Sequence, residues 1–126
     1  MTRDEILAIP AGGEMDKLVA EKVLQKPRCW QWVMQRVYPL EMQNFGCTHN
    51  GNCYPDGNPP FYSTNISAAW QVVDFFVNKY GGACIEQSDS QGWCASFYMV
   101  GIEFYATSDS APLAICRAAL LAVMAL

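Results

Sequence analysis

Residues 83–107 read ACIEQSDSQGWCASFYMVGIEFYAT, and this stretch decides the fold class. It predicts two β-strands, 83–87 and 92–100, joined by the polar segment SDSQ. Residues 101–107 continue either as a short third strand or as an extension past Gly101. Strands this close in sequence predict a small antiparallel or mixed sheet, which becomes stable only when helices pack against it.

The strongest helical pattern precedes this sheet and runs from 63 to 80. Ser63 or Thr64 is expected to cap the helix, and Gly81-Gly82 to end it. Its apolar residues recur at helical spacing and mark one face, with Phe76 beside it. These residues are Ile66, Ala69, Trp70, Val73, Val77 and Tyr80.

Further helices are predicted at both ends of the chain. Thr2 and Glu5 form a capping-box pattern before a short helix, and a second helix follows from about 14 to 25. A last helix follows the segment TSDSAP, in which Asp109 or Ser110 is the expected cap. The mixture of helices and strands predicts an α+β fold.

The composition is that of a folded domain. The chain has 126 residues, 52% of them hydrophobic, which predicts one domain over 1–126. Its net charge of −4 and its eight scattered Lys and Arg residues argue against direct nucleic-acid binding. The apolar stretch 110–126 is short for a membrane span and carries Arg117 at its centre, so we expect a buried helix and no membrane association. The start of the chain lacks signal-peptide organisation, which favours a cytoplasmic protein.

A further strand is predicted at 29–39, CWQWVMQRVYP. Alternation places Trp30, Trp32 and Arg36 on one face, which is typical either of a ligand platform or of a core or shared interface. The following segment, about 40–62, has no sustained period and predicts a long irregular loop. Loops of this length are often functional.

Three segments together resemble a known family. They are TRDEILAIPAGGEMDKLVAEKV at 2–23, YSTNISAAWQVVDFF at 62–76 and APLAICRAALLAVM at 111–124, with GWCASF between the last two. The chain is similar over nearly its whole length to the phage ABA-sandwich domain, a family of small phage and prophage proteins. The resemblance implies an α–β–α layered sandwich, with a small, mostly antiparallel sheet flanked by helices, and a place in the host cytoplasm during infection. It carries over no catalytic residue, and the Cys-rich 40–62 loop is its main departure.

Cys47, His49 and Cys53 bring soft metal ligands together in that loop. The spacing C-x-H-x3-C is not a usual zinc spacing, so a zinc site, a Cys47–Cys53 disulfide and ordinary loop residues all stay open. No other cofactor is expected. His49 is the only histidine, and no nucleophile elbow, P-loop or dinucleotide motif is present, so we do not expect an enzyme.

The segment Tyr62-Ser63-Thr64-Asn65 lies where the strongest helix begins. A helix N-terminus offers free N–H groups and partial positive charge, and neighbouring hydroxyls can complete a site for phosphate or carboxylate. Plain capping is the alternative. Aromatic rings and arginines elsewhere would complete the site. The expected ligand-binding residues are Tyr62, Ser63, Thr64, Asn65, Trp30, Trp32, Arg36, Trp93 and Arg117.

These observations support more than one function. The first hypothesis is a non-enzymatic phage accessory protein that sequesters a small anionic ligand, such as a nucleotide made in host immune signalling. The second is an acidic inhibitor that binds a host defence protein directly. The third is a structural or assembly protein without a ligand. The apolar last helix and the Trp-rich strand also predict a homo-oligomer.

Overall fold

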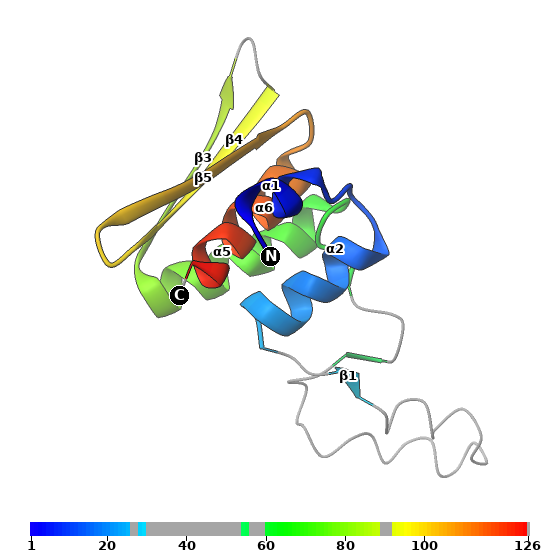
Figure 1. The fold of residues 1–126 in the computed structure, drawn as a ribbon. Coiled ribbons are helices and arrows are strands. Elements are labelled where there is room, and N and C mark those ends of the chain that lie inside the picture. Colours follow the sequence, from blue (N-terminus) through cyan, green and yellow to red (C-terminus); the bar gives the residue numbers. More distant parts are fainter. Residues whose placement is uncertain (26–27, 30–53, 56–59, 89–91, 126) are drawn as a thin grey trace, which may run out of the picture.

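The computed structural model describes residues 1–25, 28–29, 54–55, 60–88 and 92–125. Figure 1 shows a sheet with helices packed against it, which confirms the predicted α+β class. The helices are α1 (Arg3–Ala8), α2 (Gly13–Leu18), the π-helix η1 (Val19–Val23), α5 (Ile66–Tyr80) and α6 (Ala111–Met124). The strands are β1 (Arg28–Cys29), β2 (Tyr54–Pro55), β3 (Gly82–Ser88), β4 (Gly92–Met99) and β5 (Ile102–Ser108).

The main sheet is antiparallel, with β4 between β3 and β5. The predicted strands are therefore confirmed, and the third is a separate strand. Val100 and Gly101 form the two-residue connection between β4 and β5, with φ angles of 52° and 76°. Positive φ at both positions is what the twist of a tight hairpin demands. Val100 is β-branched and rarely adopts this conformation, so the turn is locally strained.

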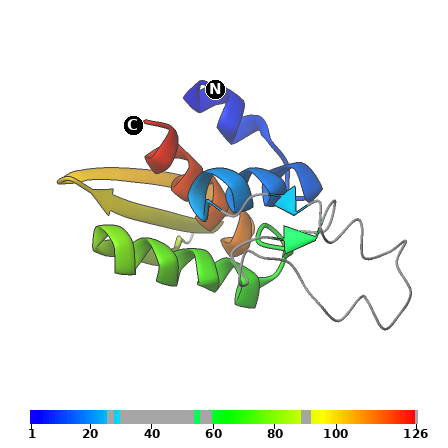
Figure 2. The same ribbon diagram turned by 90° about the horizontal axis from the view of Figure 1, so that it is seen from below.

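The face of the sheet that meets the helices forms the core. Ala95, Phe97 and Met99 alternate along β4 and are buried, whereas Tyr98 lies on the opposite face and is exposed. Figures 1 and 2 show α5 and α6 on the same side of the sheet. α6 lies between the sheet and the N-terminal helices, and it contacts β4, β5, α5, η1 and α1. Its burial confirms the predicted core helix. Within the described ranges, no helix is long and apolar enough to cross a membrane.

The N-terminal segment packs on the far side of α6. Thr2 Oγ1 accepts a hydrogen bond from Glu5 N at 3.2 Å, which confirms the predicted helix start. The helix expected at 14–25 is divided into α2 and η1, and its wider π-type turn is closed by the hydrogen bond from Leu24 N to Val19 O at 3.0 Å. Figure 2 shows this segment beside α6.

The start of α5 corrects the predicted cap. The cap is Asn65, whose side chain accepts from Ala68 N at 3.0 Å, and the helix begins at Ile66. Ser63 and Thr64 precede it in a turn. Gly81, with a φ of 117°, ends α5 as predicted.

The predicted strand at 29–39 lies mostly outside the described residues. Its first residue belongs to β1, which pairs in parallel with β2. Most of the 40–62 segment also lies outside the described ranges.

Candidate functional site

The turn before α5 is tied to α2 by a buried set of hydrogen bonds. Ser63 N donates to Asp16 Oδ1 at 2.8 Å, and Ser63 Oγ donates to the same oxygen at 2.6 Å. Ser63 Oγ also accepts from Gly12 N at 2.9 Å. Both Ser63 and Asp16 are buried. We call this set the Asp16–Ser63 junction.

The junction corrects the prediction that Ser63 binds a ligand. Its amide and its hydroxyl hydrogen both point to a carboxylate, as expected for an anion site near a helix N-terminus. The carboxylate is Asp16 of the same chain. The sequence does not reveal this pairing locally, because Asp16 and Ser63 are 47 positions apart.

Tyr62 is also buried, which corrects its predicted role in ligand contact. Its hydroxyl has no hydrogen-bond partner among the described residues. Burial, together with the proximity of Cys116 and Asp16, raises the pKa of Tyr62 to about 12. The pKa of the Cys116 thiol is also raised, mainly by burial and to a lesser extent by the nearby Asp16 carboxylate. Both groups are therefore neutral at physiological pH and packed in the core.

The other predicted ligand residues do not gather around this turn. Thr64 and Asn65 are exposed, and the Asn65 side chain caps α5. Arg117 is half-buried in α6, where its Nη2 donates to Ile9 O at 3.1 Å and thereby binds the end of α1. Its Nε has no partner within the described part of the chain.

Several predicted residues lie outside the described ranges. The structure therefore does not test the aromatic-platform prediction or the zinc prediction. These residues are Trp30, Trp32, Arg36, Cys47, His49 and Cys53. Among the residues that are described, no group of three or more His, Cys, Asp and Glu side chains could hold a metal ion. Cys84, Cys94 and Cys116 are free thiols.

A groove lies between α5 and β3. It consists of two adjoining cavities that share Trp70 and Ile85. The larger, of about 530 Å³, is also lined by Ile66, Trp93 and the first turn of α6. The smaller, of about 310 Å³, is lined further along α5 by residues including Asp74 and Val77. Trp93 is thus the one predicted ligand residue that lines this groove in the described structure.

The groove exposes large apolar side chains. Ile66, Trp70 and Val77 retain 51%, 48% and 38% of their accessible surface. These positions follow one another on the same side of a helix with 3.6 residues per turn. The core-facing side of α5 is different and consists of Ala69, Val72, Val73 and Phe76. The apolar face predicted for this helix is therefore divided, since Ala69 and Val73 are buried in the core whereas the row Ile66, Trp70 and Val77 is exposed.

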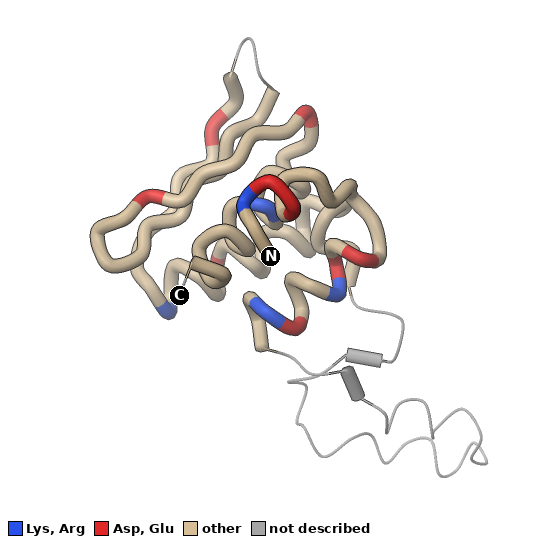
Figure 3. Tube along the Cα trace, in the orientation of Figure 1, with Lys and Arg blue, Asp and Glu red and all other residues tan. Residues whose placement is uncertain are grey.

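The charges near the groove are negative. Asp74 lines the smaller cavity, and Asp109 precedes the α6 turn that lines the larger cavity, whereas Glu86 of β3 points to the opposite face of the sheet. In Figure 3 the three strands of the main sheet carry no Lys or Arg, and β3 and β5 each carry an acidic residue. Lys79 lies two and a half turns from Trp70, on the opposite side of α5, with its Nζ 5.5 Å from the Phe75 ring centroid.

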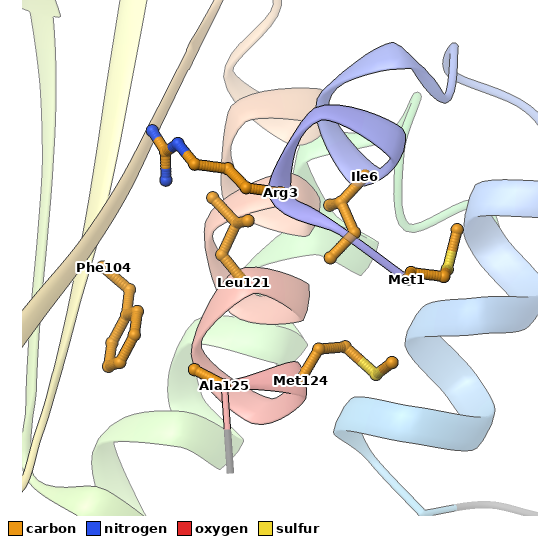
Figure 4. A pocket seen from close by; sticks show the side chains of 7 residues that line it. All are labelled: Met1, Arg3, Ile6, Phe104, Leu121, Met124 and Ala125. Atoms are coloured by element: carbon orange, nitrogen blue, oxygen red, sulfur yellow. The ribbon is translucent and has the colours of Figure 1, made fainter.

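A third cavity, of about 290 Å³, lies between α1, α6 and β5 (Figure 4). Arg3 at its rim extends toward β5, where its Nη2 lies 3.5 Å from Tyr105 O and its guanidinium lies 5.3 Å from the Tyr105 ring centroid. The remaining lining residues, among them Ile6, Phe104 and Leu121, are apolar. The side chain of Arg3 is already engaged with the chain, so this cavity offers less to a ligand than the groove does.

Comparisons with known proteins agree with this architecture. A crystal structure of a phage protein from Bacillus cereus ATCC 14579 is similar to the chain, with a TM-score of 0.65 and 23% sequence identity. The similarity covers 92% of this chain and 94% of that one, and at this identity it shows a shared fold alone. The search of curated proteins finds no significant match. The sequence profile of the phage ABA sandwich domain matches residues 17–120, and the chain therefore belongs to that family.

Proposed function

We propose that this phage protein acts without catalysis, by binding a host protein through the groove between α5 and β3. The observation that carries the proposal is the exposed apolar row Ile66, Trp70 and Val77. An amphipathic surface helix normally presents polar residues on the side that faces water. Contiguous exposed apolar surface with a tryptophan at its centre is typical of protein interaction sites.

The charges favour a protein partner over an anionic nucleotide. The residues that line the two cavities of the groove include Asp74 and, as far as the chain is described, no Lys or Arg. The donor groups of Ser63 bind Asp16, and Arg117 binds Ile9 O. An anion with several phosphates would need positive side chains that the groove does not supply. Direct binding of a host defence protein is thus better supported than nucleotide sequestration.

The absence of catalysis is part of the proposal. Catalytic acids, bases and nucleophiles usually have shifted pKa values and sit in a cleft. The described groups with a raised pKa are Tyr62, Cys84, Tyr98 and Cys116, and none of them lines the groove. A groove built from apolar side chains is suited to contact and burial.

A second candidate is the sequestration of a small planar ligand, because Trp70 and Trp93 both line the larger cavity. Its volume of about 530 Å³ lies within the range of small-molecule sites. Two indole rings can stack with an aromatic ligand. The first turn of α6 borders this cavity, and its cap residue Ser110 makes no side-chain hydrogen bond to it. A ligand with one negative group would fit there better than a polyanion.

Site-specific photocrosslinking tests the proposal. The full chain is expressed in a bacterial host with p-benzoylphenylalanine in place of Val77, within the groove, or in place of Lys22, on the exposed side of η1. We expect a discrete crosslinked host protein at Val77 and none at Lys22. The Trp70→Ser substitution in the Val77 variant should abolish the product, because it removes the largest exposed apolar side chain of the groove.

Native mass spectrometry of the purified wild-type protein tests the second candidate function, the sequestration of a small ligand. A small mass retained by the wild type and lost in Trp93→Ser, without any host-protein crosslink at Val77, would replace protein binding by ligand sequestration. Equal crosslinking at Val77 and Lys22 would contradict a specific role of the groove.

A further inference from the structure

We infer that the partner binds as an extended segment that adds a strand to the free edge of β3 and inserts alternate side chains into the groove. This inference rests on the proposed function and specifies its binding mode. Strand addition is a common mode of peptide recognition, in which backbone hydrogen bonds provide affinity and side-chain pockets provide selectivity.

The two edges of the main sheet differ. β3 is seven residues long and, within the described chain, pairs only with β4. Along such an edge, alternate residues direct their N–H and C=O groups outward, where they can bind another strand. At the β5 edge, the Arg3 side chain approaches Tyr105 O and lies against the Tyr105 ring, so part of that edge is already engaged. Within the described residues, β3 is therefore the freer of the two edges.

The groove lies beside this same edge. Ala83 and Ile85 of β3 form one wall, and Trp70 stands between the two cavities on the α5 wall. Side chains that point the same way from a strand are two residues apart, a spacing of about 6.6–6.8 Å. A strand paired with β3 would therefore place successive inward-facing side chains in the two adjoining cavities, and both should be apolar.

The acidic surroundings define the charge of the partner segment. Asp74 lines the smaller cavity, Asp109 precedes the α6 turn that borders the larger one, and Glu86 lies on the face of β3 that is turned away from the groove. A segment that carries Lys or Arg complements these carboxylates, whereas a second copy of this chain would bring its own Asp74 and Glu86 to the contact. The occupant is therefore an extended apolar segment with basic residues, supplied by another protein.

Selection from a displayed library of random 12-residue peptides tests this inference on the full chain. We expect enriched peptides with apolar residues at alternate positions and at least one Lys or Arg. The Trp70→Ser variant should bind them about thirtyfold more weakly, as for a central aromatic residue of an interface. Ile102→Ser is the control, because Ile102 is an exposed apolar residue like Trp70 but lies at the start of β5, and it should leave affinity within about twofold.

The backbone pairing is tested on the best peptide. N-methylation at alternate amides should abolish binding in one set and have little effect in the other, because only one set faces β3. In the complex, every second amide of Gly82–Ser88 should gain protection from hydrogen exchange.

The outcomes separate the binding mode from the proposed function. Peptides enriched with apolar residues at helical spacing, or peptides indifferent to N-methylation, would overturn strand addition even if the Val77 crosslink succeeds. Failure to enrich any peptide over the Trp70→Ser control would also overturn it. If wild-type protein instead dimerises through β3 with rising concentration, the occupant is a second copy and the basic-segment inference is wrong.

Discussion

The Asp16–Ser63 junction and the groove place carboxylates in opposite roles. In the junction, a buried carboxylate accepts two hydrogen bonds from one residue, and its charge serves the internal structure. In the groove, Asp74 lies among apolar side chains that remain exposed. The comparison shows that satisfied polar groups mark where the chain holds itself together, whereas exposed apolar groups mark where it can bind something else.

The largest effect should come from the junction. Asp16→Ala leaves the buried amide and hydroxyl of Ser63 without their acceptor, so we expect a loss of about 3 kcal/mol in the free energy of unfolding. Urea denaturation followed by circular dichroism measures it. Glu14→Ala, at an exposed position of the same helix, is the control and should change stability by less than about 0.5 kcal/mol. Equal effects of the two substitutions would contradict the role assigned to the junction.

The two sides of α5 can be compared by making the same Val→Ala substitution on each. Val72 is buried and Val77 is 38% exposed. Val72→Ala removes buried methyl groups and leaves a cavity, so it should cost about 2 kcal/mol, whereas Val77→Ala should cost less than about 0.5 kcal/mol. Thermal unfolding of both variants provides the measurement. A large cost for Val77→Ala would mean that the exposed row supports folding and would weaken the binding proposal.

Alkaline titration examines the buried phenol beside the junction. The pKa of Tyr62 is raised to about 12 from an ordinary value of 10, so the unfolded chain loses this proton first and stability falls between those pH values. The loss attributable to Tyr62 should be roughly 1–2 kcal/mol. Tyr62→Phe should remove that part of the pH dependence, and it should be neutral or stabilising near pH 7 because the hydroxyl has no partner in the described structure. Destabilisation by Tyr62→Phe at neutral pH would show that the hydroxyl has an unrecognised partner.

The β4–β5 turn should give the smallest effect, and it belongs to neither region. Val100 has a φ of 52° and is highly exposed. Val100→Asn should stabilise the protein by about 0.5–1 kcal/mol, because asparagine tolerates this conformation. Because the turn lies outside the groove, the same variant should bind a groove partner as wild type does. A change in peptide affinity would extend the binding surface to the hairpin.

Most of the fold could be predicted from local patterns. The capping pattern of Thr2 and Glu5, the strand pair β3 and β4 and the glycine end of α5 each depend on residues close in sequence. α6 was also predictable, since an apolar segment interrupted by Arg117 suits a buried helix whose one cation reaches the end of α1.

The site was harder to predict because it depends on distant residues. No local pattern indicates that Asp16 accepts hydrogen bonds from the amide and the hydroxyl of Ser63. α5 carries apolar residues around more than one side, and its periodicity alone did not show which side faces the sheet. The small residue Ala69 beside Val72, Val73 and Phe76 was the available signal for the core side, because a helix approaches a sheet closely where its side chains are small.

The Asp16–Ser63 junction also fixes the two ends of a long intervening stretch of chain. Because these residues are 47 positions apart, the hydrogen bonds between them close a large loop in the covalent chain. The entropic cost of closing such a loop rises only with the logarithm of its length, by about 0.6 kcal/mol per doubling. Insertions or deletions between β1 and β2 should therefore be tolerated by the helices and the sheet, which makes this interval a natural place for sequence diversification within the same scaffold.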